Sequence, residues 1–126
     1  MTGAIWIIQI VHYPTFLFVK EPAFAQFHHF HSSQITWIVA PMMVLELLTG
    51  LMLAYLFQGI WIFQFFLILL LWIVTFFISV PLHNNLGQVR DEPKIKRLVF
   101  TNWLRTFLWT LRTLILFFVV SIGPAA

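Results

Sequence analysis

The chain contains little charge and no cysteine. Only 9% of its 126 residues are charged, whereas 61% are hydrophobic and the mean hydropathy is +0.95. Because a soluble domain carries roughly 25% charged residues, four acids and seven bases could not cover a soluble surface of this size. The missing cysteine excludes disulfides, iron–sulfur clusters and thiol chemistry. These absences exclude a soluble globular domain and a disordered chain, and they leave a small integral membrane protein whose partner is the lipid bilayer.

The few bases are concentrated in two polar links. Five of the seven bases lie there: Lys20, Arg90, Lys94, Lys96 and Arg97. The net charge is +3 and the pI about 9.8, but bases clustered in links favour an orientation signal over nucleic-acid binding, so we expect no nucleic-acid partner. The positive-inside rule places both links in the cytoplasm and both termini on the non-cytoplasmic side, which in a bacterium is the periplasmic side of the inner membrane.

Four apolar segments approach the length of about 20 residues that a helix needs to cross the hydrocarbon core. They lie at about 3–19, 33–57, 60–82 and 99–122. Segment 23–33 follows Pro22 and is expected to be helical and to continue into the second span. The polar stretch 83–97 is expected to be a loop in which Pro93 breaks any helix. The sequence therefore predicts an all-α fold: a single domain, 1–126, forming a four-helix bundle with four transmembrane spans.

Ionisable side chains within a span usually face the interior of the bundle. Arg105 and Arg112 follow Asn102 in helical steps and share one face of the fourth span with Trp109. At 1.5 Å per residue, Glu46 and Arg112 both lie about 20 Å from the cytoplasmic ends of their spans. We therefore predict a buried ion pair between them. Such a pair is either a structural lock or the floor of a cavity.

Histidines form the other cluster of candidate functional residues. His28 and His31 share one side of a helix, and His83 ends the third span at the same membrane face. Neutral imidazoles from two elements could hold a transition metal or a haem, although histidines are also ordinary at a membrane interface. His12 lies within the first span beside Tyr13. It is either a packing histidine or a proton donor near the level of Arg105.

The stretch from 80 to 112, VPLHNNLGQVRDEPKIKRLVFTNWLRTFLWTLR, resembles the anthrone oxygenase-like family of small four-span membrane proteins. The resemblance rests on Pro81, Asn84, Asn85, Asn102 and Arg105, and it covers roughly the second half of the chain. It implies a four-span layout and oxygen chemistry on an aromatic or quinone-like substrate.

These patterns favour a membrane oxidoreductase that acts on a lipophilic aromatic or quinone-like molecule near the cytoplasmic side. The expected ligands of a metal or haem, or a general base, are His28, His31 and His83. The groups expected to bind a substrate oxygen are Asn84, Asn102 and Arg105, with His12 and Tyr13 as proton donors. The alternatives are a small carrier or proton or ion pathway, and a non-catalytic accessory subunit. A homo-oligomer is compatible with the sequence.

Overall fold

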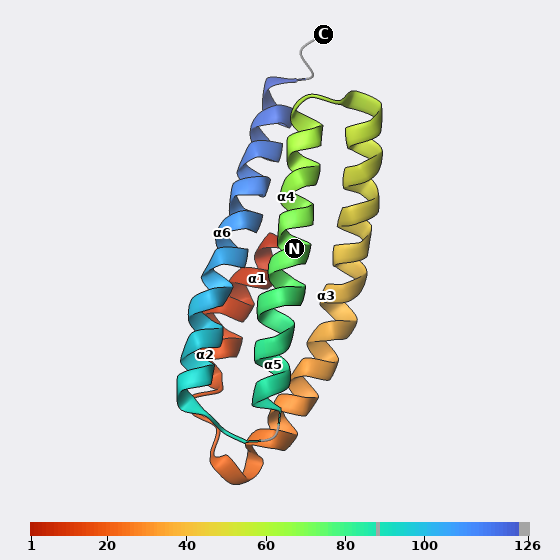
Figure 1. Cartoon of the computed structure of the whole chain (residues 1–126). Coiled ribbons are helices and arrows are strands. Elements are labelled where there is room, and N and C mark those ends of the chain that lie inside the picture. The colour runs from red at the N-terminus through yellow and green to blue at the C-terminus, as the bar shows by residue number, and fades with distance from the viewer. Residues whose placement is uncertain (88, 124–126) are drawn as a thin grey trace.

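The computed structural model describes residues 1–87 and 89–123. Within these ranges the fold is all-helical, and four helices run up and down in alternation (Figure 1). The elements in chain order are α1 (Thr2–Ile7), the π-helical η1 (Ile8–His12), α2 (Tyr13–Thr15), α3 (Glu21–Phe57), α4 (Ile60–Val74), the π-helical η2 (Thr75–Ser79), α5 (Val80–Leu86) and α6 (Glu92–Ile122). The first helix comprises α1, η1 and α2, and the third comprises α4, η2 and α5.

Three helices are long and apolar enough to cross a membrane. They are Glu21–Phe57, Ile60–Leu86 and Glu92–Ile122. Their outward side chains include many large exposed hydrophobics, such as Trp37, Phe77 and Phe100, as a lipid-facing surface requires. The first helix is shorter than predicted, because it ends at Thr15 and the chain turns over 16–19. A fourth crossing therefore stays a prediction.

Prolines mark where two of the long helices begin. Pro22 lies in the first turn of α3, which runs unbroken through 23–33 as the sequence predicted. The expectation that Pro93 breaks any helix is wrong, since it lies in the first turn of α6. A proline is tolerated there because the amide hydrogen that it lacks would have no partner within the helix. The side chain of Asp91 caps this helix by accepting a hydrogen bond from the Lys94 amide at 3.1 Å.

The two polar links lie together at one end of the bundle. The Arg90 guanidinium donates a hydrogen bond to the Leu17 carbonyl oxygen at 2.9 Å, which joins the second link to the first. Lys94 pairs with Asp91 at 2.9 Å, and these contacts hold the pKa of the Asp91 carboxyl below its usual value. The bases from which the orientation was predicted therefore lie at one end of the bundle.

The second helix is packed closely at one end and loosely at the other. Near the turn at Gln58 and Gly59, α3 packs along α4, and Gly50 lies so close to Ile68 that any Cβ would collide with the Ile68 Cδ1 atom. Toward its other end α3 contacts α5 only sparsely. The first helix packs against α6 on the other side (Figure 1). The space between α3 and η2–α5 is where the candidate site lies.

Candidate functional site

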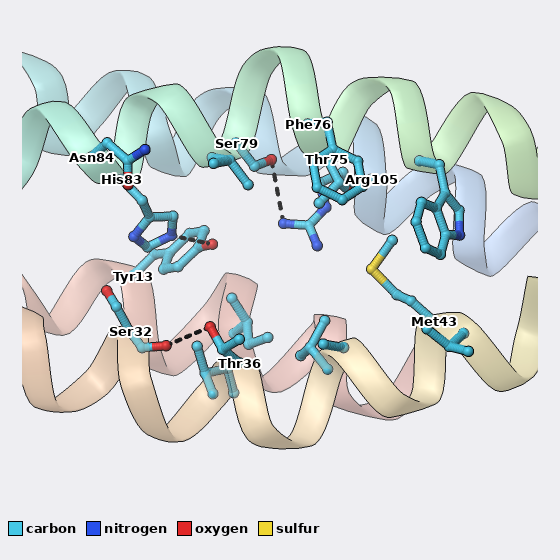
Figure 2. A pocket seen from close by; sticks show the side chains of 17 residues that line it. Tyr13, Ser32, Thr36, Met43, Thr75, Phe76, Ser79, His83, Asn84 and Arg105 are labelled. Carbon is cyan, nitrogen blue, oxygen red and sulfur yellow. Dashed lines mark hydrogen bonds between the residues drawn. The ribbon is translucent and has the colours of Figure 1, made fainter.

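A cavity of about 310 Å³ lies between α3 and the third helix. Most of its wall is apolar, and the residues that form this wall include Ile35, Val39, Met43, Trp72 and Phe76. Figure 2 shows Tyr13, Ser79, His83 and Arg105 among the side chains that line it.

The cavity opens through the side of the bundle. Thr36 and Val44 on α3 and Phe76 and Val80 on the third helix line the cavity, and all four are also exposed on the outer surface. These residues belong to the apolar stretches of two helices that are long enough to span a membrane. The cavity can therefore be reached between α3 and η2–α5 from the outer surface that these helices share.

Arg105 brings a positive charge to the cavity. Its side chain is only 5% exposed, and its Nη1 atom donates to Ser79 Oγ and Asn102 Oδ1, each at 3.3 Å. The guanidinium carbon lies 5.2 Å from the centroid of the Trp109 ring, a cation–π arrangement. Its Nε atom is buried without a hydrogen-bond partner. Among the described residues no carboxylate forms a salt bridge with Arg105.

A buried amide pair holds Asn102 in position beside Arg105. The Asn102 amide donates to Gln9 Oε1 at 2.8 Å, and Gln9 in turn donates to the Val99 carbonyl oxygen at 3.1 Å. Gln9 is only 2% exposed. It was not predicted as a site residue, although an amide within an apolar span was a signal that could have identified it.

Two π-helical segments supply residues around the arginine. η1 carries Gln9, and η2 carries Ser79, which accepts the hydrogen bond from Arg105. π-Helical turns are rare and occur mostly as single turns, often at functional sites. Ser79 was also missed from the sequence, because nothing in its apolar surroundings shows that it faces an arginine.

Tyr13, His83 and His28 form a hydrogen-bonded chain beside the cavity. The Tyr13 hydroxyl is 2.8 Å from His83 Nε2, and His83 Nδ1 is 3.3 Å from His28 Nε2. Tyr13 and His28 are each only 4% exposed. His31 lies next to this chain, with its ring centroid 6.4 Å from that of His83. The histidines predicted from the sequence therefore gather at one place.

In the structure, His83 and His28 are hydrogen-bonded to neighbouring side chains. Both ring nitrogens of His83 are occupied, one by Tyr13 and the other by His28. In the described part of the chain, no group of three or more His, Asp or Glu side chains could hold a metal ion. The metal or haem stays a prediction, and we derive no chemistry from it.

His12 and Asn84 lie at the margin of the site. The His12 ring is 5.3 Å from the His31 ring, and His12 is not among the residues that line the cavity. Of the two expected proton donors, Tyr13 lines the cavity and His12 does not, so the role of His12 as a proton donor stays a prediction. Asn84 lines the cavity from its exposed rim.

The predicted contact between Glu46 and Arg112 is present, but the pair is half-buried and not buried as expected, with 21% of the Glu46 and 11% of the Arg112 side chain exposed. Arg112 Nη1 lies 3.2 Å from Glu46 Oε1, and the Trp109 indole donates to Glu46 Oε2 at 2.9 Å. The amino group of Met1 is 3.7 Å from the same carboxylate. The pair lies beyond the cavity and does not line it. Trp109 contacts both arginine centres, with its ring at Arg105 and its N–H at Glu46.

No family model, curated protein or solved structure matches the chain. The resemblance to the anthrone oxygenase-like family thus stays a prediction, and the geometry of the site is the basis for assigning a function.

Proposed function

We propose that the chain is an integral membrane oxidoreductase that binds a lipophilic aromatic molecule through a carbonyl or phenolic oxygen. The observation that carries this proposal is the buried guanidinium of Arg105 in an apolar cavity that opens through the side of the bundle. Arginine is suited to this task because its planar donors can bind an oxygen atom on which negative charge develops. The polar links lie on the cytoplasmic side in this proposal, as their bases indicate.

The size and lining of the cavity support an aromatic ligand. A volume of about 310 Å³ lies at the lower end of the range for ligand pockets and admits one or two fused rings. Trp72, Phe76 and Tyr13 present aromatic surface to it. Such a ligand would place its oxygen against Arg105 and its apolar edge toward the opening between α3 and η2.

Tyr13 and the two histidines supply a route for a proton. The Tyr13 hydroxyl lines the cavity, and its hydrogen bond to His83 continues to His28 near the end of the bundle that carries the bases. A phenolic hydroxyl bound beside Tyr13 would lose its proton along this chain while Arg105 stabilises the phenolate. This acid–base role is typical of tyrosine and histidine.

The reaction we propose is the oxidation of a hydroquinone or similar phenol by dioxygen. Two electrons and the protons of the two hydroxyl groups leave the hydroquinone, and dioxygen accepts them to become hydrogen peroxide. The products are the quinone and peroxide, so atoms and electrons balance. The resemblance to an oxygenase family supports dioxygen as the acceptor, and the Tyr13–His83–His28 chain supports the proton transfer.

The test is hydroquinone oxidation by the protein purified in detergent, followed as oxygen uptake and peroxide formation. We expect the wild-type protein to accelerate oxidation of menadiol, and Tyr13→Phe to lower the rate by about 100-fold, because general acid–base catalysis contributes at least that much. Tyr55→Phe is the matched control, since Tyr55 is the only other tyrosine and is 81% exposed. No acceleration by the wild-type protein, or equal rates for both variants, would contradict the proposal.

A further inference from the structure

We infer that the cavity takes its ligand as an anion, an ionised hydroxyquinone or phenolate whose negative charge compensates Arg105. This inference rests on the proposed binding of a lipophilic oxygen compound and specifies its charge. It starts from the unequal number of charges in the middle of the bundle. Two arginines, Arg105 and Arg112, and the Met1 amino group lie there with a single carboxylate, that of Glu46.

The carboxylate of Glu46 is already engaged. One of its oxygens contacts Arg112 at 3.2 Å, and the other accepts the Trp109 indole hydrogen bond at 2.9 Å. The acids of the second polar link pair with lysines, Asp91 with Lys94 and Glu92 with Lys96. The interior around Arg105 is therefore left with a net positive charge that the described residues do not neutralise.

Neutral groups compensate Arg105 only in part. Ser79 and Asn102 accept hydrogen bonds from one nitrogen, and Trp109 presents its ring face. A buried charge without an opposite charge is costly in an apolar medium, and such groups are usually paired. The Nε atoms of Arg105 and Arg112 both lack a hydrogen-bond partner, so what sets Arg105 apart is that it has no carboxylate.

A negatively charged ligand in the cavity would lie next to Arg105. Figure 2 shows the guanidinium extending into it from the α6 side, with Tyr13 and His83 nearby. The lining contains no Asp, Glu or Lys. Besides Arg105, its ionisable groups are Tyr13 and His83. An anion with an apolar body meets every feature of this site. A neutral carbonyl would form the same hydrogen bonds but leave the charge of Arg105 uncompensated.

The aromatic lining favours a planar anion over a fatty acid. Tyr13, Trp72 and Phe76 offer ring surface to a flat ligand whose charge is delocalised over oxygen and ring. An ionised hydroxyquinone has this shape. The carboxylate of a fatty acid shares the charge but not the planar ring system, so the two sources can be compared directly.

The experiment compares lawsone, a hydroxynaphthoquinone that is ionised at neutral pH, with its uncharged methyl ether. Binding to the detergent-purified protein is measured by calorimetry and by quenching of tryptophan fluorescence. We expect the wild-type protein to bind lawsone about tenfold more tightly than the ether, since charge-assisted hydrogen bonds are roughly twice as strong as neutral ones. Laurate should displace lawsone only at higher concentration. Tighter binding of laurate would keep the anion site and overturn the aromatic class.

Substitutions of two arginines on α6 test whether the preference for lawsone depends on Arg105. Arg105→Met should abolish the preference for lawsone, and Arg105→Lys should retain part of it because the charge remains. Arg97→Met is the matched control, since Arg97 is exposed in the first turns of the same helix, and it should behave as wild type. Equal binding of lawsone and ether by the wild-type protein would overturn the inference and leave the proposed function standing. Binding of neither compound would overturn both.

Discussion

Two arginines on the same face of α6 lie in opposite electrostatic surroundings. Arg112 faces Glu46 at 3.2 Å, in a pair that the Trp109 indole also supports. Arg105, two turns away, has only neutral partners. The first arrangement neutralises its charge within the protein. The second leaves a charge exposed to a cavity, which is what a site for a charged or oxygen-bearing ligand requires.

The helices are also packed closely near Arg112 and loosely near Arg105. Near Glu46, α3 packs on α4 so closely that a side chain at Gly50 would require Ile68 to shift. Near Arg105, α3 stands apart from η2 and α5, and the cavity fills the space. One half of the bundle is thus closed by an ion pair and a small residue. The other half is open and lined by the polar groups of the candidate site.

The comparison predicts its largest effect at the ion pair. Glu46→Gln should lower the free energy of unfolding by about 2 kcal/mol, less than for a fully buried pair, because it leaves the half-buried Arg112 charge without its carboxylate. Unfolding in mixed micelles with increasing dodecyl sulfate, followed by circular dichroism, measures this loss. Glu21→Gln is the matched control, since Glu21 is exposed at the start of the same helix.

A double variant separates the lost pair from other damage. Glu46→Met combined with Arg112→Met should recover most of the stability, because apolar residues of similar size can replace a buried pair. If Glu46→Gln unfolds at the same denaturant concentration as wild type, the carboxylate of Glu46 does not stabilise the protein by pairing with Arg112.

A smaller effect should follow when Arg105 is given the partner that Arg112 already has. Asn102→Asp places a carboxylate where the amide oxygen now lies, 3.3 Å from the guanidinium. We expect the affinity for lawsone to fall about tenfold, because the charge that would attract it is neutralised within the protein. Asn85→Asp makes the same change at an exposed asparagine outside the cavity and should leave binding intact. Unchanged binding by Asn102→Asp would show that the ligand does not depend on an uncompensated Arg105.

The smallest effect is expected at the closed packing of α3 on α4. Gly50→Ala adds a methyl group that meets Ile68 Cδ1, so the isoleucine must shift, at a cost of about 1 kcal/mol in unfolding free energy. Gly3→Ala is the control, because nothing lies within 4 Å of its would-be Cβ. Equal stability of the two variants in the same unfolding assay would mean that Gly50 is not needed for close packing.

Several features of the site follow from regular geometry and were predictable. The rise of a helix is constant, so counting residues placed Glu46 and Arg112 at the same depth, and the structure brings them into contact. Helical spacing likewise put Asn102 and Arg105 on one buried face. The contact between His28 and His83 was also predictable, because both residues lie at the same end of the bundle.

Other features depend on departures from that geometry. At the end of the π-helical η1, Tyr13 lines the cavity, whereas the His12 ring lies against His31. The same kind of turn in η2 presents Ser79 to Arg105. The expectation for Pro93 failed because a proline breaks a helix when it lies in the interior but is tolerated in the first turn. The capping Asp91 places Pro93 in the first turn of α6.

By itself the sequence determined a chain of apolar helices, the face of each helix that carries polar groups, and the pairing of Glu46 with Arg112. These follow from composition and from the fixed period of the helix. Because Glu46 is the only acid within the predicted spans, its pairing with Arg112 already implied that Arg105 has no carboxylate there. Only the tertiary structure decided that a cavity lies in front of Arg105. The cavity depends on how far α3 diverges from the third helix, and that divergence is set by packing between residues far apart in the sequence.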